Sequence, residues 1–281
     1  MPTSDEPYSL ARKGPLDLIG DVHGSIRTLD AMLERLGYVC SGGRWSHPEG
    51  RFLISLGDLI DRGPDPLGCV ERIAALAADE CGQMVLGNHE INALHYVEGL
   101  RENSEKNRAQ FEATLRQIEA DPARWDRARR FIESQPTHML ADEGRLRVVH
   151  AYWDEDWIPR LPWRIDSPEL LRATAPGGEL LEAIEQCIKG PEETCPRYQD
   201  SNGHWRETRR LAWWTEYPAD APRIVFGHYW FPWAEHTPKT PSWTGPGRNA
   251  ACLDFRAGKG GDLVALRYPE HEFVRVTNLD F

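Results

Sequence analysis

Five short hydrophobic runs recur along the chain, and each of them ends at a polar residue. The runs cover residues 16–20, 52–57, 84–87, 146–149 and 224–227, and the residues that follow them are Asp21, Asp58, Asn88, His150 and His228. Their length and apolar character predict short buried β-strands. Four of the five runs end in glycine, which allows a sharp turn at the strand end. Because α/β folds place their sites beyond the carboxyl ends of strands, we expect these five side chains to meet at one edge.

Apolar residues at helical spacing separate several of these runs. The spacing predicts helices over 26–36 and 70–77, and a further helix near 178–188. Residues 101–135 are more polar and predict two helices with a break at an Asp-Pro pair. We interpret 101–135 as a helical insertion that forms a solvated cap on the core, with substrate recognition as the alternative role.

The other segments complete an α/β pattern. Residues 155–222 are rich in proline, tryptophan and glycine, so we expect long loops there apart from the one helix. Residues 252–276 alternate like strands on either side of a glycine-rich turn at 258–261. No internal repeat or low-complexity linker divides the chain, and we therefore expect a single domain over 1–281.

Composition narrows the classes of protein and partner. The chain has 281 residues, of which 40% are hydrophobic, and a formal net charge of −11, which disfavours non-specific binding to nucleic acid. It contains no apolar stretch of about 18 residues, and its first residues are neither basic nor apolar, so we expect no membrane partner and no signal peptide. The six cysteines form no Cys-x-x-Cys pair, which indicates a cytoplasmic protein with reduced thiols, although Cys187 and Cys195 could close a small loop.

Two short motifs follow the first two runs. In the first, Asp21 and His23 stand two residues apart, and a loop can turn both toward one ion. In the second, Asp58 stands directly after the strand, and Asp61 and Arg62 follow within five residues. A carboxylate can bridge two cations, and an arginine can hold phosphate oxygens with its planar fork. The alternative for the second motif is a structural turn with an Asp61–Arg62 ion pair.

Three further elements extend the set. Asn88 offers a neutral oxygen, and His89 titrates near neutral pH and can serve as a general acid. His150 and His228 each follow an apolar run, where a lone histidine is more often structural than a ligand. Together, however, three histidines, two aspartates and one asparagine provide mixed nitrogen and oxygen ligands, which suit Mn, Fe or Zn. Two such ions about 3.5–4 Å apart can hold a bridging hydroxide and direct it at phosphorus.

Gly-Asp-x-His-Gly at 20–24, Gly-Asp-x-x-Asp-Arg-Gly at 57–63 and Gly-Asn-His-Glu at 87–90, in this order, resemble the signature of a known family. It is the phosphoprotein phosphatase branch of the calcineurin-like metallophosphoesterases. The resemblance implies a four-layer α/β sandwich in which two packed mixed β-sheets are flanked by helices. It also implies two divalent metal ions, with Mn²⁺ favoured and Fe or Zn as alternatives, and a phosphorylated substrate.

The resemblance implies a role for each matching position. Asp21, His23 and His228 would hold one metal, Asp58 would bridge, and Asn88 and His150 would complete the second metal site. His89 would protonate the leaving oxygen while Asp61 orients it. Arg62 would clamp the phosphate, with Asn88 also close to the substrate.

The chain departs from this pattern in two places. Ala151 and Tyr152 follow His150, where the eukaryotic phosphatases usually have two glycines, and Glu90 stands where bacterial relatives that cleave diadenosine polyphosphates often have Asp. The second phosphate-binding arginine is expected between His150 and His228. That interval holds seven arginines, and no local motif selects one of Arg160, Arg164, Arg197, Arg206, Arg209, Arg210 and Arg223.

Three hypotheses about function follow. The first is a phosphatase for phosphoproteins or small phosphate monoesters, and the second is a hydrolase of dinucleoside polyphosphates. The third is a binding module with an inactive site, which the intact set of ligands and His89 disfavours. Tryptophans flank the last two histidines and could stack on a nucleobase, although we favour a packing role for them; they are Trp153, Trp157, Trp213, Trp214, Trp230 and Trp233.

Overall fold

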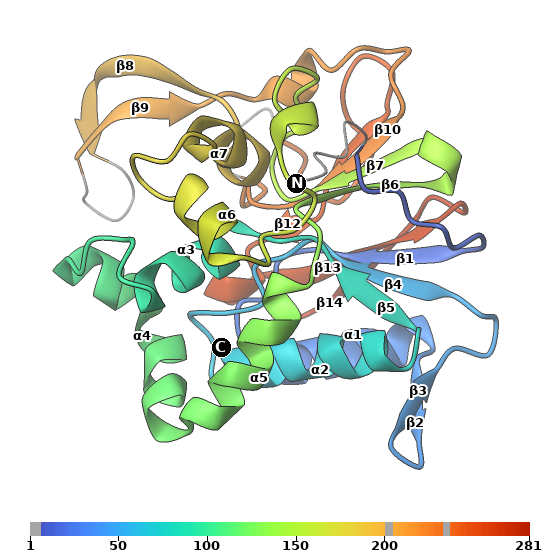
Figure 1. Cartoon of the computed structure of the whole chain (residues 1–281). Coiled ribbons are helices and arrows are strands. Elements are labelled where there is room, and N and C mark those ends of the chain that lie inside the picture. Colours follow the sequence, from blue (N-terminus) through green and yellow to red (C-terminus); the bar gives the residue numbers. More distant parts are fainter. Residues whose placement is uncertain (1–6, 200–204, 233–236) are drawn as a thin grey trace.

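A computed structural model describes residues 7–199, 205–232 and 237–281 of the chain. Two mixed β-sheets pack together in its centre (Figure 1). One hydrophobic cluster joins residues of both sheets, among them Leu18, Ile54, Val148 and Val225, which are completely buried. The mixed α/β fold with two main sheets agrees with the prediction made from the sequence.

The larger sheet has six strands; it contains most of the first two predicted runs, whereas only Met84 of the third, 84–87, lies in a strand. Its order is β12-β13-β1-β4-β5, with β14 paired to β13; β1, β4 and β5 are parallel, and β13 is antiparallel to β1. Every residue of β1 and β4 is buried, which explains why both segments are mostly apolar without alternation; the exceptions are Ser55 and Asp17, and Asp17 pairs with the buried Arg51. The strands are β1 (Leu16–Ile19), β4 (Phe52–Ser55), β5 (Gly82–Met84), β12 (Asp254–Phe255), β13 (Asp262–Tyr268) and β14 (Glu272–Val276).

The smaller sheet has four strands in the order β11-β10-β7-β6. Strands β7, β10 and β11 are parallel, and β6 is antiparallel to β7. The last two predicted runs are therefore neighbours in this sheet. The strands are β6 (His138–Ala141), β7 (Leu146–Val149), β10 (Arg223–Phe226) and β11 (Ala250–Cys252).

Seven α-helices lie around the sheets in the described part of the chain. Helix α1 packs on β13 and β14, and α2 packs on β5 and on α5. The helices are α1 (Ile26–Leu36), α2 (Pro66–Ala78), α3 (Asn88–Val97), α4 (Glu105–Ala120), α5 (Pro122–Glu133), α6 (Pro168–Ala173) and α7 (Leu181–Lys189). Four short 3-10 turns, at Asp142–Gly144, Ile158–Arg160, Trp213–Thr215 and Ala257–Lys259, complete the helical elements.

Residues 101–135 contain the helix pair α4 and α5. The side chain of Ser104 caps the start of α4 by accepting a hydrogen bond from the Asn107 N–H. Asp121 ends α4 and caps α5, with Pro122 in the first turn of α5, so the Asp-Pro pair sets the bend. The pair does more than cap the core, because α4 contributes side chains to the cavity described below.

The segment 155–222 differs from the expected long loops. It contains a two-stranded hairpin of β8 (Glu192–Gln199) and β9 (Trp205–Arg210), which projects from the body of the molecule (Figure 1). A second small hairpin, β2 (Val39–Ser41) and β3 (Arg44–Ser46), follows α1. Both hairpins are largely exposed, so they lack the apolar alternation that marks a half-buried strand.

All six cysteines are free thiols, and the possible Cys187–Cys195 pair is not formed. Among the described helices, none has the length and apolar character needed to cross a bilayer. The single-domain assignment and the cytoplasmic location remain predictions.

Candidate metal and phosphate site

The five polar residues that follow the hydrophobic runs meet where the two sheets adjoin. Asp21, Asp58 and Asn88 follow the parallel strands β1, β4 and β5 of one sheet. His150 and His228 follow the parallel neighbours β7 and β10 of the other. Because each strand delivers its residue from its carboxyl end, both sheets contribute side chains to one buried site.

Glycine is required where these loops approach one another. Gly57 has φ +91°, and a Cβ atom there would lie 2.4 Å from the Gly87 nitrogen. Gly258, in the predicted turn near the C-terminus, lies against His23, and a Cβ atom would come within 2.5 Å of the ring. Any side chain at either position would therefore displace a loop that carries a candidate ligand.

Backbone strain is concentrated at the same place. Twelve non-glycine residues in the described part of the chain have positive φ, and half of them belong to the site or contact it. These six are His23, Asp58, Asp61, Arg62, His228 and Trp230. Such conformations are unfavourable by about 1–3 kcal/mol each and persist where the surrounding structure imposes them, typically at functional sites.

Two groups of ligand atoms share Asp58. His23, Asp58 and His89 form the first group, and Asp58, His150 and His228 form the second. In each group the ligand atoms lie within 4.8 Å of one another, and all five residues are buried. A carboxylate common to two groups has the geometry required of a bridging ligand.

The protonation of the histidines suits metal binding. His23 donates from Nδ1 to the carbonyl oxygen of Ile60 at 3.0 Å, and its buried Nε2 has no hydrogen-bond partner. His228 lies 2.8 Å through Nδ1 from the Asn88 Oδ1 atom, and its Nε2 also lacks a partner. Burial lowers the pKa of both histidines well below the usual value, so both are neutral. Neutral imidazoles with an unpaired buried nitrogen fit a divalent cation.

His150 is oriented in the same manner but carries a different charge. Its Nδ1 donates to the Leu56 carbonyl oxygen at 2.7 Å, and its Nε2 lies 3.2 Å from Asn88 Oδ1 and 3.4 Å from Asp58 Oδ1. Burial opposes protonation, but the Asp58 carboxylate outweighs it and raises the pKa of His150 to about 10. In turn, burial of Asp58 is outweighed by His150 and His89, which hold the pKa of Asp58 well below its usual value. A dication placed here would replace the proton on His150.

His228 lies between the two groups of expected ligands, and its assignment to the ion of Asp21 and His23 stays a prediction. Its ring lies beside His150, Asn88 and Asp58. Asp21 lies beside His228 because both its carboxylate oxygens accept from the His228 backbone N–H, at 3.2 and 3.1 Å. Burial and the neighbouring Asp254 carboxylate raise the pKa of Asp21, which marks a place for positive charge.

His89 and Asp61 form a close pair. The Nδ1 atom of His89 lies 2.5 Å from Asp61 Oδ2, which leaves Nε2 on the side of Asp58, 3.9 Å from its Oδ2 atom. Burial opposes protonation of His89, but Asp58 and Asp61 raise its pKa above the usual value. A buried histidine that keeps its proton near neutral pH can serve as a general acid.

Two buried acids that the sequence did not assign hold the loops of the site. Glu90 accepts hydrogen bonds from the backbone N–H groups of Asp58, Leu59 and Gly87 at 2.7–3.0 Å. Asp254 accepts from the Trp230 N–H at 2.7 Å. Glu90 was visible as part of the third motif, whereas nothing local to Asp254 indicated a role.

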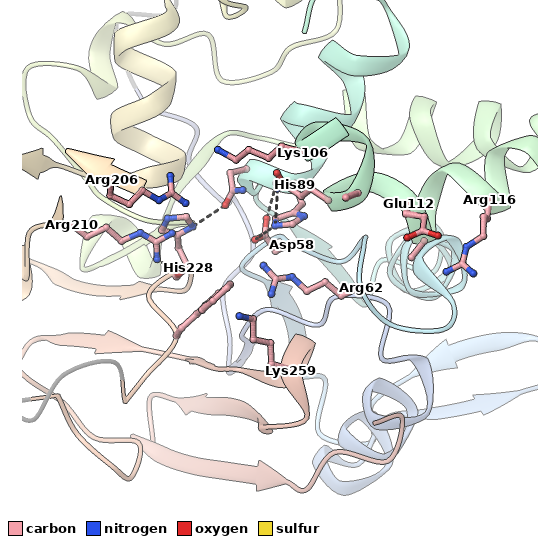
Figure 2. Close-up of a pocket in the computed structure, with 15 residues that line it drawn as sticks. Asp58, Arg62, His89, Lys106, Glu112, Arg116, Arg206, Arg210, His228 and Lys259 are labelled. Carbon is pink, nitrogen blue, oxygen red and sulfur yellow. Dashed lines mark hydrogen bonds and ion pairs between the residues drawn. The ribbon is translucent and has the colours of Figure 1, made fainter. Parts of the chain in front are cut away.

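A cavity of about 540 Å³ opens above Asp58, Asn88, His89 and His228. Basic side chains from four parts of the chain line it (Figure 2). They are Arg62 from the second motif, Lys106 and Arg116 from α4, Arg206 and Arg210 from β9, and Lys259 from the last 3-10 turn. Of the seven arginines between His150 and His228, the structure thus brings Arg206 and Arg210 to the site.

Trp230 joins two of these cations. The Arg62 guanidinium carbon lies 4.5 Å from the centre of the Trp230 ring, and the Lys259 ammonium lies 4.1 Å from it. Trp213 and Trp214 instead pack against Phe226 in the core, as favoured from the sequence. Trp233 lies outside the described residues.

A family model for calcineurin-like phosphoesterases matches residues 14–244. The chain belongs to this family. It is therefore a metal-dependent phosphoesterase, as predicted from the motifs, and the paired His/Asp groups are consistent with a dinuclear centre.

Curated relatives are similar over nearly the whole chain. The bis(5′-nucleosyl)-tetraphosphatase PrpE [asymmetrical] of Geobacillus thermodenitrificans is 33% identical over 270 residues, which cover 93% of each protein. The protein of the same name from Anoxybacillus flavithermus is 29% identical, with 92% of this chain and 93% of the relative covered.

Solved structures show the same fold at low identity. A putative diadenosine tetraphosphatase has a TM-score of 0.53 at 16% identity, with 98% of both chains covered. The cold-active protein-tyrosine phosphatase of a psychrophilic Shewanella has a TM-score of 0.56 at 17% identity, over 99% of this chain and 80% of the other.

Proposed function

We propose that the chain hydrolyses dinucleoside tetraphosphates, with two Mn²⁺ ions at the buried site. The relatives similar over nearly the whole chain carry the name of this activity, which favours it over the phosphomonoesterase activity ranked first from the sequence.

The observation that carries the proposal is the charge of the cavity. Its lining contains six Lys and Arg side chains against two carboxylates, Asp58 and Glu112. The chain as a whole has 33 basic and 44 acidic residues, so this concentration runs against its net charge. One phosphate group is held by two or three cations, whereas a chain of phosphates carries enough charge to engage the full set.

Each residue then has a chemical role. Asp21, His23, Asp58, Asn88, His150 and His228 would hold the ions, which supply positive charge that neutralises the phosphate and lowers the pKa of water. Arg62, with Arg206 or Arg210, holds the phosphate under attack. Arg210 is well placed for this because it also donates to the His228 carbonyl oxygen at 3.1 Å.

His89 gives the leaving phosphate its proton, and Asp61 holds the His89 ring through Nδ1. Lys106, Arg116 and Lys259 also line the cavity, where they would contact the phosphates and the nucleotide that leave. Nucleotide release follows from cleavage of one phosphoanhydride bond by water, with the proton of the water passing to solvent.

A substrate panel tests the proposal. Purified protein with Mn²⁺, or with chelator, is given diadenosine tetraphosphate, p-nitrophenyl phosphate and a phosphopeptide. We expect metal-dependent release of nucleotide from the first, at a kcat/KM well above that for the other two. Preference for the phosphopeptide would replace this proposal by the phosphatase hypothesis, and turnover of none would refute both.

A charge variant ties the result to the cavity. Lys259→Met should raise the KM for diadenosine tetraphosphate about fivefold, which corresponds to a loss of roughly 1 kcal/mol of binding free energy. The KM for p-nitrophenyl phosphate should not change. Lys13→Met is the matched control, because Lys13 is paired with Glu143 and does not line the cavity. Equal KM changes for both substrates would assign Lys259 to the phosphate under attack.

A further inference from the structure

The inserted helix α4 lies against the second motif through one face. Gln110, Thr114 and Gln117 follow one another at helical spacing along this face. Gln117 reaches the loop that starts α2: its Oε1 accepts from the Leu67 N–H at 2.9 Å, and its Nε2 donates to Asp65 Oδ1 at 2.9 Å. At the other end of the face, Gln110 Nε2 lies 3.5 Å from His89 Nε2. Helix α4 thus runs along the loop between β4 and α2, from the Asp61–His89 pair at one end to the start of α2 at the other.

Thr114 stands in the middle of this face and is completely buried. Its hydroxyl donates to Asp61 Oδ1 at 2.5 Å and accepts from the Asp61 backbone N–H at 3.0 Å. Both hydrogen-bonding capacities of this hydroxyl, as donor and as acceptor, are therefore used on one residue. Asp61 itself has φ +70° and is almost fully buried, so its conformation depends on such external contacts.

The two oxygens of the Asp61 carboxylate have separate partners. Oδ1 accepts from Thr114, and Oδ2 faces His89 Nδ1 at 2.5 Å. With Oδ1 fixed by the hydroxyl, the carboxylate cannot rotate without breaking a buried hydrogen bond, which is unfavourable in a site of low polarity. The direction of Oδ2, and with it the plane of the His89 ring, is set by the helix.

We propose that Thr114 is a positioning residue of the phosphoesterase site, which holds the Asp61–His89 pair in the orientation needed for proton transfer to the leaving group. The inference rests on the proposed role of this site in hydrolysis. It gives the insertion a part in the chemistry: α4 carries no ligand, yet it determines where the general acid points.

The chain offers a closely matched control. Thr28, on α1, is also completely buried, and its hydroxyl donates to Asp280 Oδ2 at 2.6 Å and accepts from the Leu279 N–H at 2.9 Å. Thr28→Val and Thr114→Val therefore remove the same pair of hydrogen bonds from a helix, one far from the cavity lining and one beside His89. Thr114→Ser keeps the hydroxyl, and Thr114→Cys keeps a weaker donor of similar size.

The first readout needs neither metal nor turnover. In metal-free protein labelled with ¹⁵N-histidine, the downfield Nδ1–H proton of His89, assigned by its loss in His89→Gln, reports the bond to Asp61. We expect it to be present in the wild type, Thr114→Ser and Thr28→Val, and broadened or lost in Thr114→Val. An unchanged signal in Thr114→Val would overturn the inference. If valine prevents folding, the same comparison is made with Thr114→Cys. A signal equal to that of the wild type in this variant would then overturn the inference.

The second readout is kinetic. We expect kcat of Thr114→Val to fall about tenfold on phenyl phosphate and less on p-nitrophenyl phosphate, since a positioned general acid contributes about 10²–10⁴-fold and matters most for poor leaving groups. KM and metal content should stay at wild-type values, and Thr114→Ser should restore kcat. A uniform loss on both substrates, matched by Thr28→Val, would show a structural role alone. A wild type that hydrolyses neither these esters nor diadenosine tetraphosphate would refute the proposed function, whereas the ring signal would still decide the inference.

Discussion

The contact of Trp230 with two cations of the cavity gives a quantitative prediction for Trp230→Ala. The ring centre lies 4.5 Å from the Arg62 guanidinium and 4.1 Å from the Lys259 ammonium. A cation–π contact of this kind contributes about 1 kcal/mol at a partly exposed position. Removing both contacts loses about 2 kcal/mol of the interaction energy that holds the two cations in place. At about 1.4 kcal/mol per tenfold, this loss corresponds to a fall of roughly 30-fold in kcat/KM. Because bound phosphate itself orders the two cations, we expect a fall of about 5- to 30-fold.

The assay is kcat/KM for diadenosine tetraphosphate with saturating Mn²⁺, together with metal analysis of each variant. Metal content should not change, because the backbone N–H of residue 230 keeps its hydrogen bond to Asp254 in the alanine variant. Trp230→Phe, which retains an aromatic face, should give an intermediate value.

Trp157→Ala is the control, since Trp157 makes a contact of the same length, 4.5 Å, with Arg160 outside the cavity lining. A kcat/KM within about twofold of wild type in Trp230→Ala, with full metal content, would contradict the reasoning, because the two contacts together are worth more than that. An equal fall in Trp157→Ala would attribute the effect to general loss of aromatic packing.

Three further outcomes are expected. Asp58→Asn should lose metal and turnover together, as measured by metal analysis, whereas His89→Ala should keep metal and lose turnover; equal metal loss in both would make His89 a ligand. Mn²⁺ should raise the melting temperature, because the unpaired Nε2 atoms of His23 and His228 gain a partner only in the folded protein. Burial lowers the pKa of His138 to about 4, below the value of about 6.5 in an unfolded chain, so the unfolded state binds more protons between these values. The free energy of unfolding should therefore fall by up to about 3 kcal/mol as pH drops from about 6.5 to 4, and a urea titration of His138→Gln with the same pH dependence as wild type would contradict this.

The metal ligands could be located from the sequence because each one stands within four residues of the end of a largely buried strand. A strand that is covered on both faces is mostly apolar, so the polar residues beyond its end are visible, as at Asp58 after β4. A glycine turn within one or two positions of that residue then sets the direction of its side chain. The division of the ligands between the two ions stays a prediction, because it depends on how the two sheets pack, which no local pattern records.

The hairpin β8–β9 was missed for a physical reason. Its strands are exposed and polar, with Pro196 inside β8, so neither the apolar alternation nor the composition of a strand is present. The hairpin nevertheless carries Arg206 and Arg210 to the cavity. Their selection among seven arginines follows from the register of β9 against β8, which is a property of the folded chain.

Most of the cations that line the cavity differ in origin from the residues expected to hold the metal. Lys106 comes from an inserted helix, Arg210 from an exposed hairpin, and Lys259 from a turn between the last strands. None of these segments is part of the strand-end motifs, and none of them supplies an expected metal ligand. The strand ends therefore indicate the reaction, whereas we expect the substrate to be selected by α4, the β8–β9 hairpin and the turn at Ala257–Lys259. Replacing Lys106 and Arg116 of α4 should accordingly change which phosphates are cleaved before it changes whether phosphate is cleaved at all.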